Sequence, residues 1–171
     1  MASKETDELT VFPTTFLEHE GTKIVAALEV LKKHGCVRDR TLEMRDFVSS
    51  KSIGEFSRQA DKFKIREYFS LGMNLDNWRR WIAEVGPVIV RGDMDSSWLS
   101  VPNRCSDAYC LTEASTGERV GGHAFALVGY DSDTFIARNS AGGHWGHKGH
   151  VRIGNKYVKS ILTEAYGIAM D

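Results

Sequence analysis

The sequence predicts an α+β fold, with helices in its first half and antiparallel strands in its second half. Apolar residues recur at helical spacing over residues 22–34 and 75–85, and four short strand-like stretches follow residue 120. Gly129 and the turn Asp131-Ser132-Asp133 separate the first two of these stretches, which predicts a β-hairpin. Helices followed by antiparallel strands are typical of the α+β class.

Length and composition indicate one globular domain without a membrane or nucleic-acid surface. The chain has 171 residues, of which 42% are hydrophobic, and a formal net charge of −1. No stretch of about 18 apolar residues predicts a membrane span, and the polar residues 1–9 lack the apolar core of a secretory signal. We therefore expect no nucleic acid, membrane or cofactor as partner. The expected location is the cytoplasm, with secretion or delivery as an effector as the alternative.

The three cysteines, Cys36, Cys105 and Cys110, favour a reduced chain. An odd number of cysteines argues against a framework of disulfides. Cys105 and Cys110 lie five positions apart in a polar loop, so a bridge between them is an open alternative. Thiols inside cells are mostly reduced, which makes free cysteines the expectation.

The first half of the chain begins with a polar lead-in over residues 1–14 and continues with a helix. Thr22 is the expected N-cap of this helix, which runs to His34 and stops at Gly35. Residues 36–60 are charged and weakly patterned, which predicts a loop with one short helix near residues 53–60. Alternation over residues 63–71 predicts a strand, and Asn74 can cap the helix expected over residues 75–85.

The second half begins where Gly86-Pro87 ends that helix and starts a strand over residues 88–91. Residues 92–120 are rich in Ser, Asp, Gly and Asn and predict no regular element, and a loop of that length is usually functional or mobile. The strands expected after it cover residues 123–130, 134–140, 149–153 and 164–169. Trp78, Trp81 and Trp98 are expected to pack in the core or at its rim.

A histidine and an asparagine occupy corresponding places on the predicted hairpin. His123 stands at the start of one strand, and Asn139 follows sixteen positions later at the end of the next. Neighbouring antiparallel strands can bring two such side chains together, and a carboxamide can then hold the imidazole in one tautomer and orientation. A histidine that acts as a base toward a thiol needs this restraint.

The sequence around this pair resembles the histidine–asparagine half of the papain-like cysteine proteases, in their bacterial style. The resemblance runs over roughly residues 15 to 168. It is carried by Glu20-Gly21-Thr22, Gly86-Pro87-Val88, His123-Ala124-Phe125, Val128-Gly129-Tyr130, Asn139-Ser140-Ala141-Gly142, Trp145-Gly146 and Gly149-His150-Val151-Arg152-Ile153.

The resemblance implies a single papain-like domain with a mainly helical part over residues 15–85 and a sheet or partial barrel over residues 86–171. It implies that His123 is the catalytic base and that Asn139 orients it, with Ser140 and Trp145 in supporting positions. Substrate would contact the loop Glu20-Gly21-Thr22, in which Glu20 replaces a glycine of the family, and Gly122. Ala141 replaces a tryptophan of the family, so we expect the histidine–asparagine bond to be wetter and weaker.

The nucleophilic cysteine of the family has no counterpart in these 171 residues. The family carries it in a Cys-Gly-Ser-Cys-Trp-like motif about 130–150 residues before the histidine, and only 122 residues precede His123. The chain is therefore expected to be part of a thiol peptidase whose cysteine comes from another chain or a removed segment. One alternative is an inactive relative that binds peptides or proteins. The other is a self-sufficient hydrolase or transferase that uses Cys105 or Cys110.

Two further expectations concern metals and partners. His144, His147 and His150 recur every third residue in a glycine-rich loop, but no cysteine or carboxylate stands near them at ligand spacing, so we expect no metal site. A papain-like domain without its catalytic helix would expose an apolar trough, which soluble monomers rarely tolerate. We therefore expect a complementary chain or a homo-oligomer to fill it.

Overall fold

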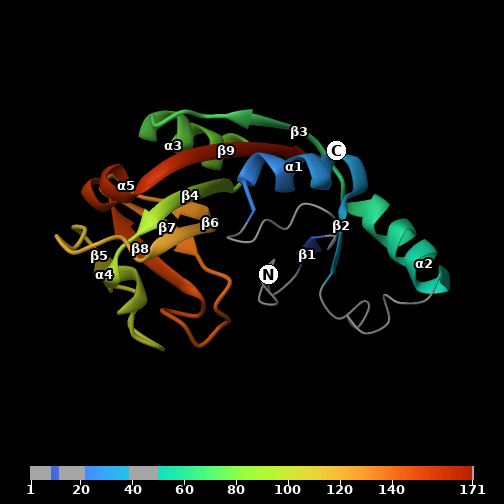
Figure 1. The fold of residues 1–171 in the computed structure, drawn as a ribbon. Helices are drawn as coiled ribbons and strands as arrows, with labels where there is room; N and C mark the ends of the chain where they lie inside the picture. Colours follow the sequence, from blue (N-terminus) through green and yellow to red (C-terminus); the bar gives the residue numbers. More distant parts are fainter. Residues whose placement is uncertain (1–8, 12–21, 39–49, 171) are drawn as a thin grey trace. The chain divides into compact units, whose positions relative to one another are not determined.

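A computed structural model of the chain describes residues 9–11, 22–38 and 50–170 (Figure 1). These residues form two compact units, one within residues 1–67 and 169–171 and the other over Tyr68–Ile168. Residues 71–82, which the sequence places in the mainly helical part, pack against the large sheet, where the backbone N–H of Leu71 donates to the Ala165 carbonyl at 2.9 Å.

The described residues of the first unit form two α-helices and a pair of short antiparallel strands. Strand β1 (Leu9–Val11) pairs antiparallel with β2 (Cys36–Arg38). Helix α1 (Ile24–His34) precedes β2, and α2 (Ser50–Ala60) continues into a 3₁₀ turn over Asp61–Phe63. Gly35 joins α1 to β2 with φ of 73°, and a Cβ atom there would collide with the carbonyl oxygen of Ala60. Only glycine fits this turn without strain.

Three sequence expectations for this unit need correction. The N-cap of α1 is Lys23 and not Thr22, because the carbonyl of Lys23 already accepts the helical bond from Ala27 at 3.1 Å. Strand β2 lies where a loop was expected, and α2 begins at Ser50 and so is longer than the helix predicted near residues 53–60. Strand β2 was missed because a three-residue strand gives almost no periodic signal, and the start of α2 was placed late because its first residues, Ser50-Lys51-Ser52, are polar.

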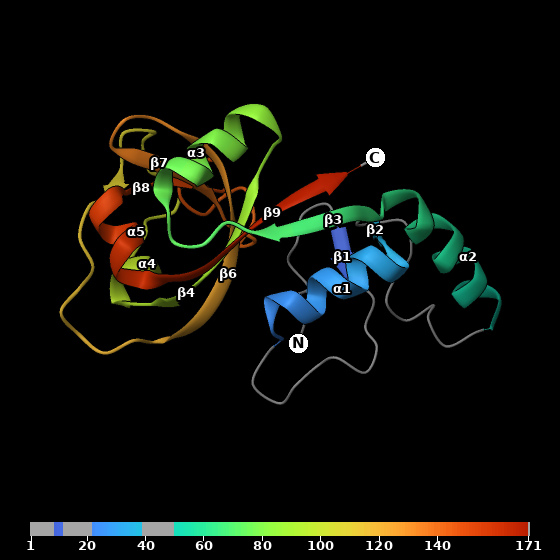
Figure 2. The same ribbon diagram turned by 90° about the horizontal axis from the view of Figure 1, so that it is seen from above.

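The second unit is built on a seven-stranded sheet with the order β3-β9-β4-β6-β7-β8-β5. Strand β4 pairs antiparallel with β6 and β9, and β7 pairs antiparallel with β6 and β8, whereas β5 pairs parallel with β8. Figures 1 and 2 show the long strand β9 running beside β4. The strands are β3 (Ile65–Ser70), β4 (Val88–Met94), β5 (Cys110–Leu111), β6 (Gly121–Tyr130), β7 (Thr134–Arg138), β8 (His150–Gly154) and β9 (Leu162–Met170).

Helix α3 (Leu75–Glu84) forms as the sequence predicts and packs on the sheet. The Asn74 side chain accepts hydrogen bonds from the N–H groups of Asp76 at 2.9 Å and Asn77 at 3.3 Å, which caps the helix. Trp78 is fully buried, with its ring centroid 5.9 Å from that of Phe135 on β7. The apolar face of α3 therefore closes one side of the main hydrophobic core.

Two short helices in the second unit escape the sequence analysis. Helix α4 (Ser96–Leu99) lies in the stretch expected to be irregular, and α5 (Asn155–Ile161) joins β8 to β9. Both views show α4 and α5 at the same end of the sheet (Figures 1 and 2). There the Tyr157 hydroxyl of α5 donates to Asp95, the N-cap of α4, at 2.9 Å. The four strands expected after residue 120 are all present, with ends shifted by one to two residues.

None of the helices in the described part of the chain is long and apolar enough to cross a membrane.

Candidate functional site

The hairpin of β6 and β7 positions the predicted histidine–asparagine pair. In the antiparallel register Ala126 on β6 lies opposite Arg138 on β7, so Asn139, the next residue after β7, reaches back toward the start of β6. On the other side of β6, His123 lies opposite Gly92 of β4. The backbone N–H of Asn139 donates to the Gly149 carbonyl at 2.9 Å, which fixes the asparagine at the end of its strand.

The two side chains are directly hydrogen bonded, with 2.9 Å between His123 Nε2 and Asn139 Oδ1. The backbone N–H of Ser140 donates to the same oxygen at 2.8 Å. Because a backbone N–H can only donate, this second bond identifies the amide atom facing the imidazole as the oxygen. The oxygen accepts, so Nε2 must carry the proton, and the neutral ring is the tautomer whose Nδ1 is unprotonated.

The other ring nitrogen, Nδ1, has no hydrogen-bond partner among the described residues. His123 as a whole is half-buried. An unprotonated, unpartnered nitrogen held in a fixed orientation can take a proton from a group placed against it. The pair therefore has the arrangement of a general base and its orienting residue.

Aromatic side chains surround the imidazole. The ring centroid of Trp98 lies 5.8 Å from that of His123 at an interplanar angle of 54°. Phe125, on β6 like the histidine, lies 6.1 Å from His123 and stacks on Trp98 at 4.6 Å. Trp145 packs on Trp98 with 5.1 Å between centroids. Asn139 has only 8% of its surface exposed, although Ala141 stands where the sequence led us to expect a wetter bond.

Trp98 is the functional-site residue that sequence reasoning missed. It was expected to be a packing residue, and it is one, with 4% of its surface exposed. The sequence could not predict the contact between Trp98 and His123, because more than twenty residues separate Trp98 from the start of β6. The available signal was a large aromatic side chain in a stretch rich in Ser, Asp, Gly and Asn.

A buried carboxylate holds α4 in place. Asp95 is fully buried and accepts hydrogen bonds from Trp98 N at 3.3 Å, Ser97 Oγ at 3.3 Å and Tyr157 Oη at 2.9 Å, and also from Ser115 N. Burial alone would raise the pKa of Asp95, but the hydrogen bonds that it accepts outweigh burial and lower that pKa below its ordinary value. The same contact and burial raise the pKa of the Tyr157 hydroxyl.

The remaining predicted site residues are placed as follows. Trp145 is buried in the aromatic cluster, and Ser140 acts through its backbone N–H. Gly122 is exposed on β6 immediately before His123, opposite Asp93 of β4. Thr22 is exposed just before α1 in the first unit. Glu20 and Gly21 lie outside the described residues.

All three cysteines are free, and no hydrogen bond joins one of their sulfurs to an imidazole of the described residues. Cys36 is buried in the first unit, where its Sγ donates to the Phe63 carbonyl at 3.4 Å. Burial raises the pKa of the Cys36 thiol. Burial also raises the pKa of the Cys110 thiol, and this effect is larger than the lowering by the nearby charge of Arg152. A raised pKa keeps a thiol protonated and poorly nucleophilic at neutral pH.

His147 and His150 are hydrogen bonded to backbone carbonyl groups. His147 Nδ1 lies 3.2 Å from the Cys105 carbonyl oxygen, and His150 Nδ1 lies 2.8 Å from that of Lys148. In the described part of the chain, no group of three or more His, Cys, Asp or Glu side chains is arranged to hold a metal ion.

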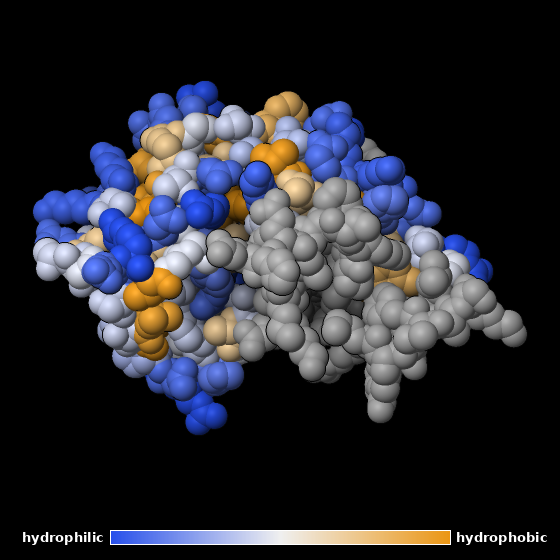
Figure 3. Space-filling view, viewed as in Figure 1, coloured by the Kyte–Doolittle hydropathy of each residue, from blue (hydrophilic) through white to orange (hydrophobic). Residues whose placement is uncertain are grey.

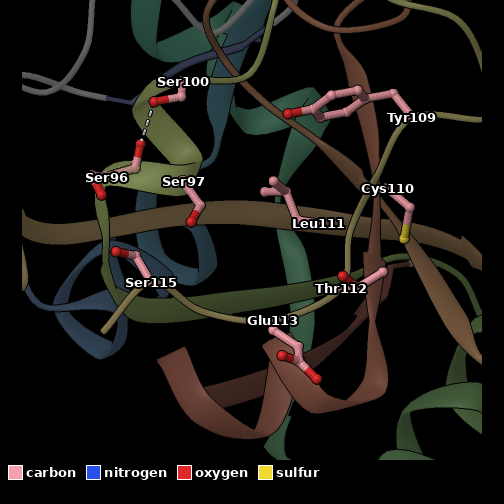
Figure 4. Close-up of a pocket in the computed structure, with 9 residues that line it drawn as sticks. All are labelled: Ser96, Ser97, Ser100, Tyr109, Cys110, Leu111, Thr112, Glu113 and Ser115. Carbon is pink, nitrogen blue, oxygen red and sulfur yellow. Dashed lines mark hydrogen bonds between the residues drawn. The ribbon is translucent and has the colours of Figure 1, made fainter. Parts of the chain in front are cut away.

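A hollow of about 370 Å³ lies beside α4 but does not include the pair. Its walls are Ser96 and Ser97 of α4, Ser100 directly after that helix, and the segment over residues 109–115, with the Cys110 sulfur at one side (Figure 4). Because neither His123 nor Trp98 lines it, the hollow is separate from the imidazole.

Comparison with known proteins agrees with this geometry. The family model of the papain family cysteine proteases matches residues 18–170. Xylellain, a cysteine protease from Xylella fastidiosa, is similar in structure with a TM-score of 0.71 and 19% identity, over 93% of this chain and 65% of xylellain. Bromelain from Ananas comosus gives a TM-score of 0.61 and 15% identity, over 88% of this chain and 70% of bromelain. A cysteine protease from Carica candamarcensis gives 0.60 and 17%, over 88% and 70%.

The chain thus spans less than two thirds of the length of xylellain. No curated protein sequence matches it significantly.

Proposed function

Because this chain belongs to the papain family of cysteine proteases, we propose that it supplies the histidine and asparagine of a thiol peptidase. The nucleophilic sulfur comes from a cysteine outside these 171 residues, on a preceding segment or a second chain. The observation that carries this proposal is the 2.9 Å bond between His123 and Asn139, which leaves Nδ1 unprotonated and without a partner among the described residues.

In the proposed reaction, Nδ1 of His123 takes the proton of the thiol, and the thiolate attacks the carbonyl carbon of a peptide bond. The tetrahedral intermediate collapses to a thioester as the C–N bond breaks, and the leaving amine takes the proton from Nδ1. Water then transfers a proton to Nδ1 and attacks the thioester carbon, which releases the carboxylic acid and returns the proton to the sulfur. Asn139 holds the imidazole in one orientation through each of these transfers.

The cysteines of the chain argue against a self-sufficient enzyme. Burial raises the pKa of Cys36 and Cys110, whereas a nucleophile needs a lowered pKa. The backbone carbonyl of Cys105 lies 3.2 Å from His147 Nδ1, and among the described residues no hydrogen bond joins the Cys105 sulfur to His123. An external cysteine is therefore the better fit for a base whose Nδ1 has no partner among the described residues.

The substrate class we propose is an extended peptide. Gly122 exposes its backbone immediately before the catalytic histidine, and main-chain hydrogen bonding to a strand is a common way to bind extended peptides. The loop Glu20-Gly21-Thr22 is also proposed to contact substrate, on its resemblance to the substrate loop of the family alone.

We also propose a complementary partner, either the segment with the cysteine or a second copy of the chain. Several apolar side chains of the second unit are exposed by 45% to 68%. On the face shown in Figure 3 apolar residues reach the surface in separate areas among hydrophilic ones. A partner that covers such side chains would gain roughly 25 cal/mol per Å² of apolar surface. The side chains are Phe69, Met73, Val85, Leu99 and Val120.

The test uses a peptide vinyl sulfone that alkylates activated cysteines. The chain is produced together with the cysteine-bearing segment encoded upstream of it or in the neighbouring reading frame, and the labelled polypeptide is identified by mass spectrometry. We expect labelling of that partner cysteine, at a rate that falls by about 10²-fold or more in His123→Ala because the base is lost. His144→Ala is the matched control, since His144 is exposed outside the pair.

Other outcomes separate the alternatives. Labelling of Cys105 or Cys110 would show a self-sufficient enzyme and refute the external cysteine. A stable complex in which no cysteine reacts, with or without His123, would show an inactive binding module.

A further inference from the structure

We propose that Trp98 is a positioning residue for His123, which covers the His123–Asn139 hydrogen bond on the side left open by the small Ala141. The consequence for catalysis rests on the function proposed above. The covering itself is a property of this chain and can be measured without any nucleophile.

The geometry places the indole against the imidazole. The two ring centroids are 5.8 Å apart with an angle of 54° between the planes, so the indole leans over the histidine ring. Among the described residues, Trp98 is the tryptophan whose ring contacts His123. Trp145 contacts the ring of Trp98 instead. Ala141 is partly buried against the same core but has only a methyl group to offer. The apolar side chains in ring contact with His123 are therefore Trp98 of α4 and Phe125 of β6, and of the two Trp98 comes from outside the hairpin.

Trp98 is itself held from three directions. Its ring is stacked on Phe125 at 4.6 Å and backed by Trp145 at 5.1 Å. Its backbone N–H donates to Asp95 Oδ1 at 3.3 Å, and the same oxygen accepts the Tyr157 hydroxyl at 2.9 Å. Asp95 and Tyr157 are both fully buried. A ring fixed in this way constrains the imidazole against it, because close-packed side chains transmit displacement.

The physical effect is a lower local dielectric around the pair. A hydrogen bond is stronger when water is kept away from it, and an aromatic ring excludes water over a large area. An indole face near the ring also attracts an imidazolium, which is the form His123 takes after it receives the thiol proton. Both effects favour the orientation in which Nε2 points to Asn139 and Nδ1 faces outward.

The experiment measures how fast the Nε2 proton of His123 exchanges with water, by NMR on the chain itself. We expect about tenfold faster exchange of this proton in Trp98→Leu. A tenfold change in rate corresponds to the free energy that about one hydrogen bond contributes. Trp98→Phe keeps a smaller ring and should give an intermediate rate, and it decides the question if the leucine variant does not fold. Trp78→Leu is the matched control, since Trp78 is also buried but packs on Phe135.

An exchange rate in Trp98→Phe equal to that of the unchanged chain would overturn the proposal, as would equal acceleration in Trp78→Leu. The outcome is independent of the proposed peptidase activity. Faster exchange in the Trp98 variants, together with no reactive cysteine in any complex, would support the role proposed for Trp98. The same result would refute the proposed peptidase activity.

Discussion

Replacing Asn139 with alanine tests whether the asparagine both stabilises the second unit and fixes the histidine tautomer. The substitution removes two hydrogen bonds to Oδ1, one from His123 Nε2 at 2.9 Å and one from Ser140 N at 2.8 Å. Each is worth about 1 kcal/mol, and a donor left unsatisfied in a partly buried site costs about 1 kcal/mol more. We therefore expect the free energy of unfolding to fall by about 2–3 kcal/mol.

Tryptophan fluorescence during urea unfolding measures this loss in the right part of the molecule. All four tryptophans lie within Tyr68–Ile168, so their emission reports on the second unit and not the first. A loss of about 2–3 kcal/mol should lower the urea midpoint by about 1 M, given typical denaturant slopes. The ¹⁵N shifts of the His123 ring should change at the same time from one tautomer to a mixture.

Asn74→Ala is the matched control. It also removes an asparagine that accepts two backbone hydrogen bonds, at 2.9 Å and 3.3 Å, but at the N-terminus of α3. It should cost about 1 kcal/mol and leave the His123 ring unchanged. If Asn139→Ala costs no more than Asn74→Ala, or if the tautomer is the same without the carboxamide, the pair is not coupled as the geometry indicates.

Two further substitutions test the supports of the site, each by the urea midpoint of the same fluorescence signal. Asp95→Asn should destabilise the second unit by about 2 kcal/mol at pH 7, because an amide cannot accept the four bonds that the carboxylate accepts. The folded pKa of Asp95 is lowered, so its contribution is present above the ordinary value of about 4 and is lost as the pH falls through the folded pKa. The difference in the free energy of unfolding between Asp95→Asn and the unchanged chain should therefore narrow below about pH 4. A difference that stays constant with pH would contradict this account. Gly146→Ala should destabilise the unit by more than about 1 kcal/mol, since φ is 57° and a Cβ atom would collide with the His150 carbonyl oxygen. Gly143→Ala, where a Cβ atom meets nothing within 4 Å, should be close to neutral, and equal effects of the two would refute the steric argument.

Much of the fold follows from local patterns. The helix over residues 75–85, its cap Asn74 and the strands after residue 120 are all seen in the sequence, because each is long enough to repeat its apolar period. Strand β2 and helices α4 and α5 are too short to repeat a period, so no local signal separates them from loops. The N-cap at Thr22 was wrong because any short polar residue near a helix start gives the same signal.

The sequence alone determined the offset between His123 and Asn139, since both lie on one hairpin and a hairpin's register is set by nearby residues. Only the tertiary structure decided what surrounds them. Trp98 reaches the imidazole because β4, which precedes α4, lies beside β6 in the sheet. Asp95 meets Tyr157 across 62 positions of sequence. Such contacts depend on the order in which strands pair, and that order is a property of the whole core rather than of any local run of residues.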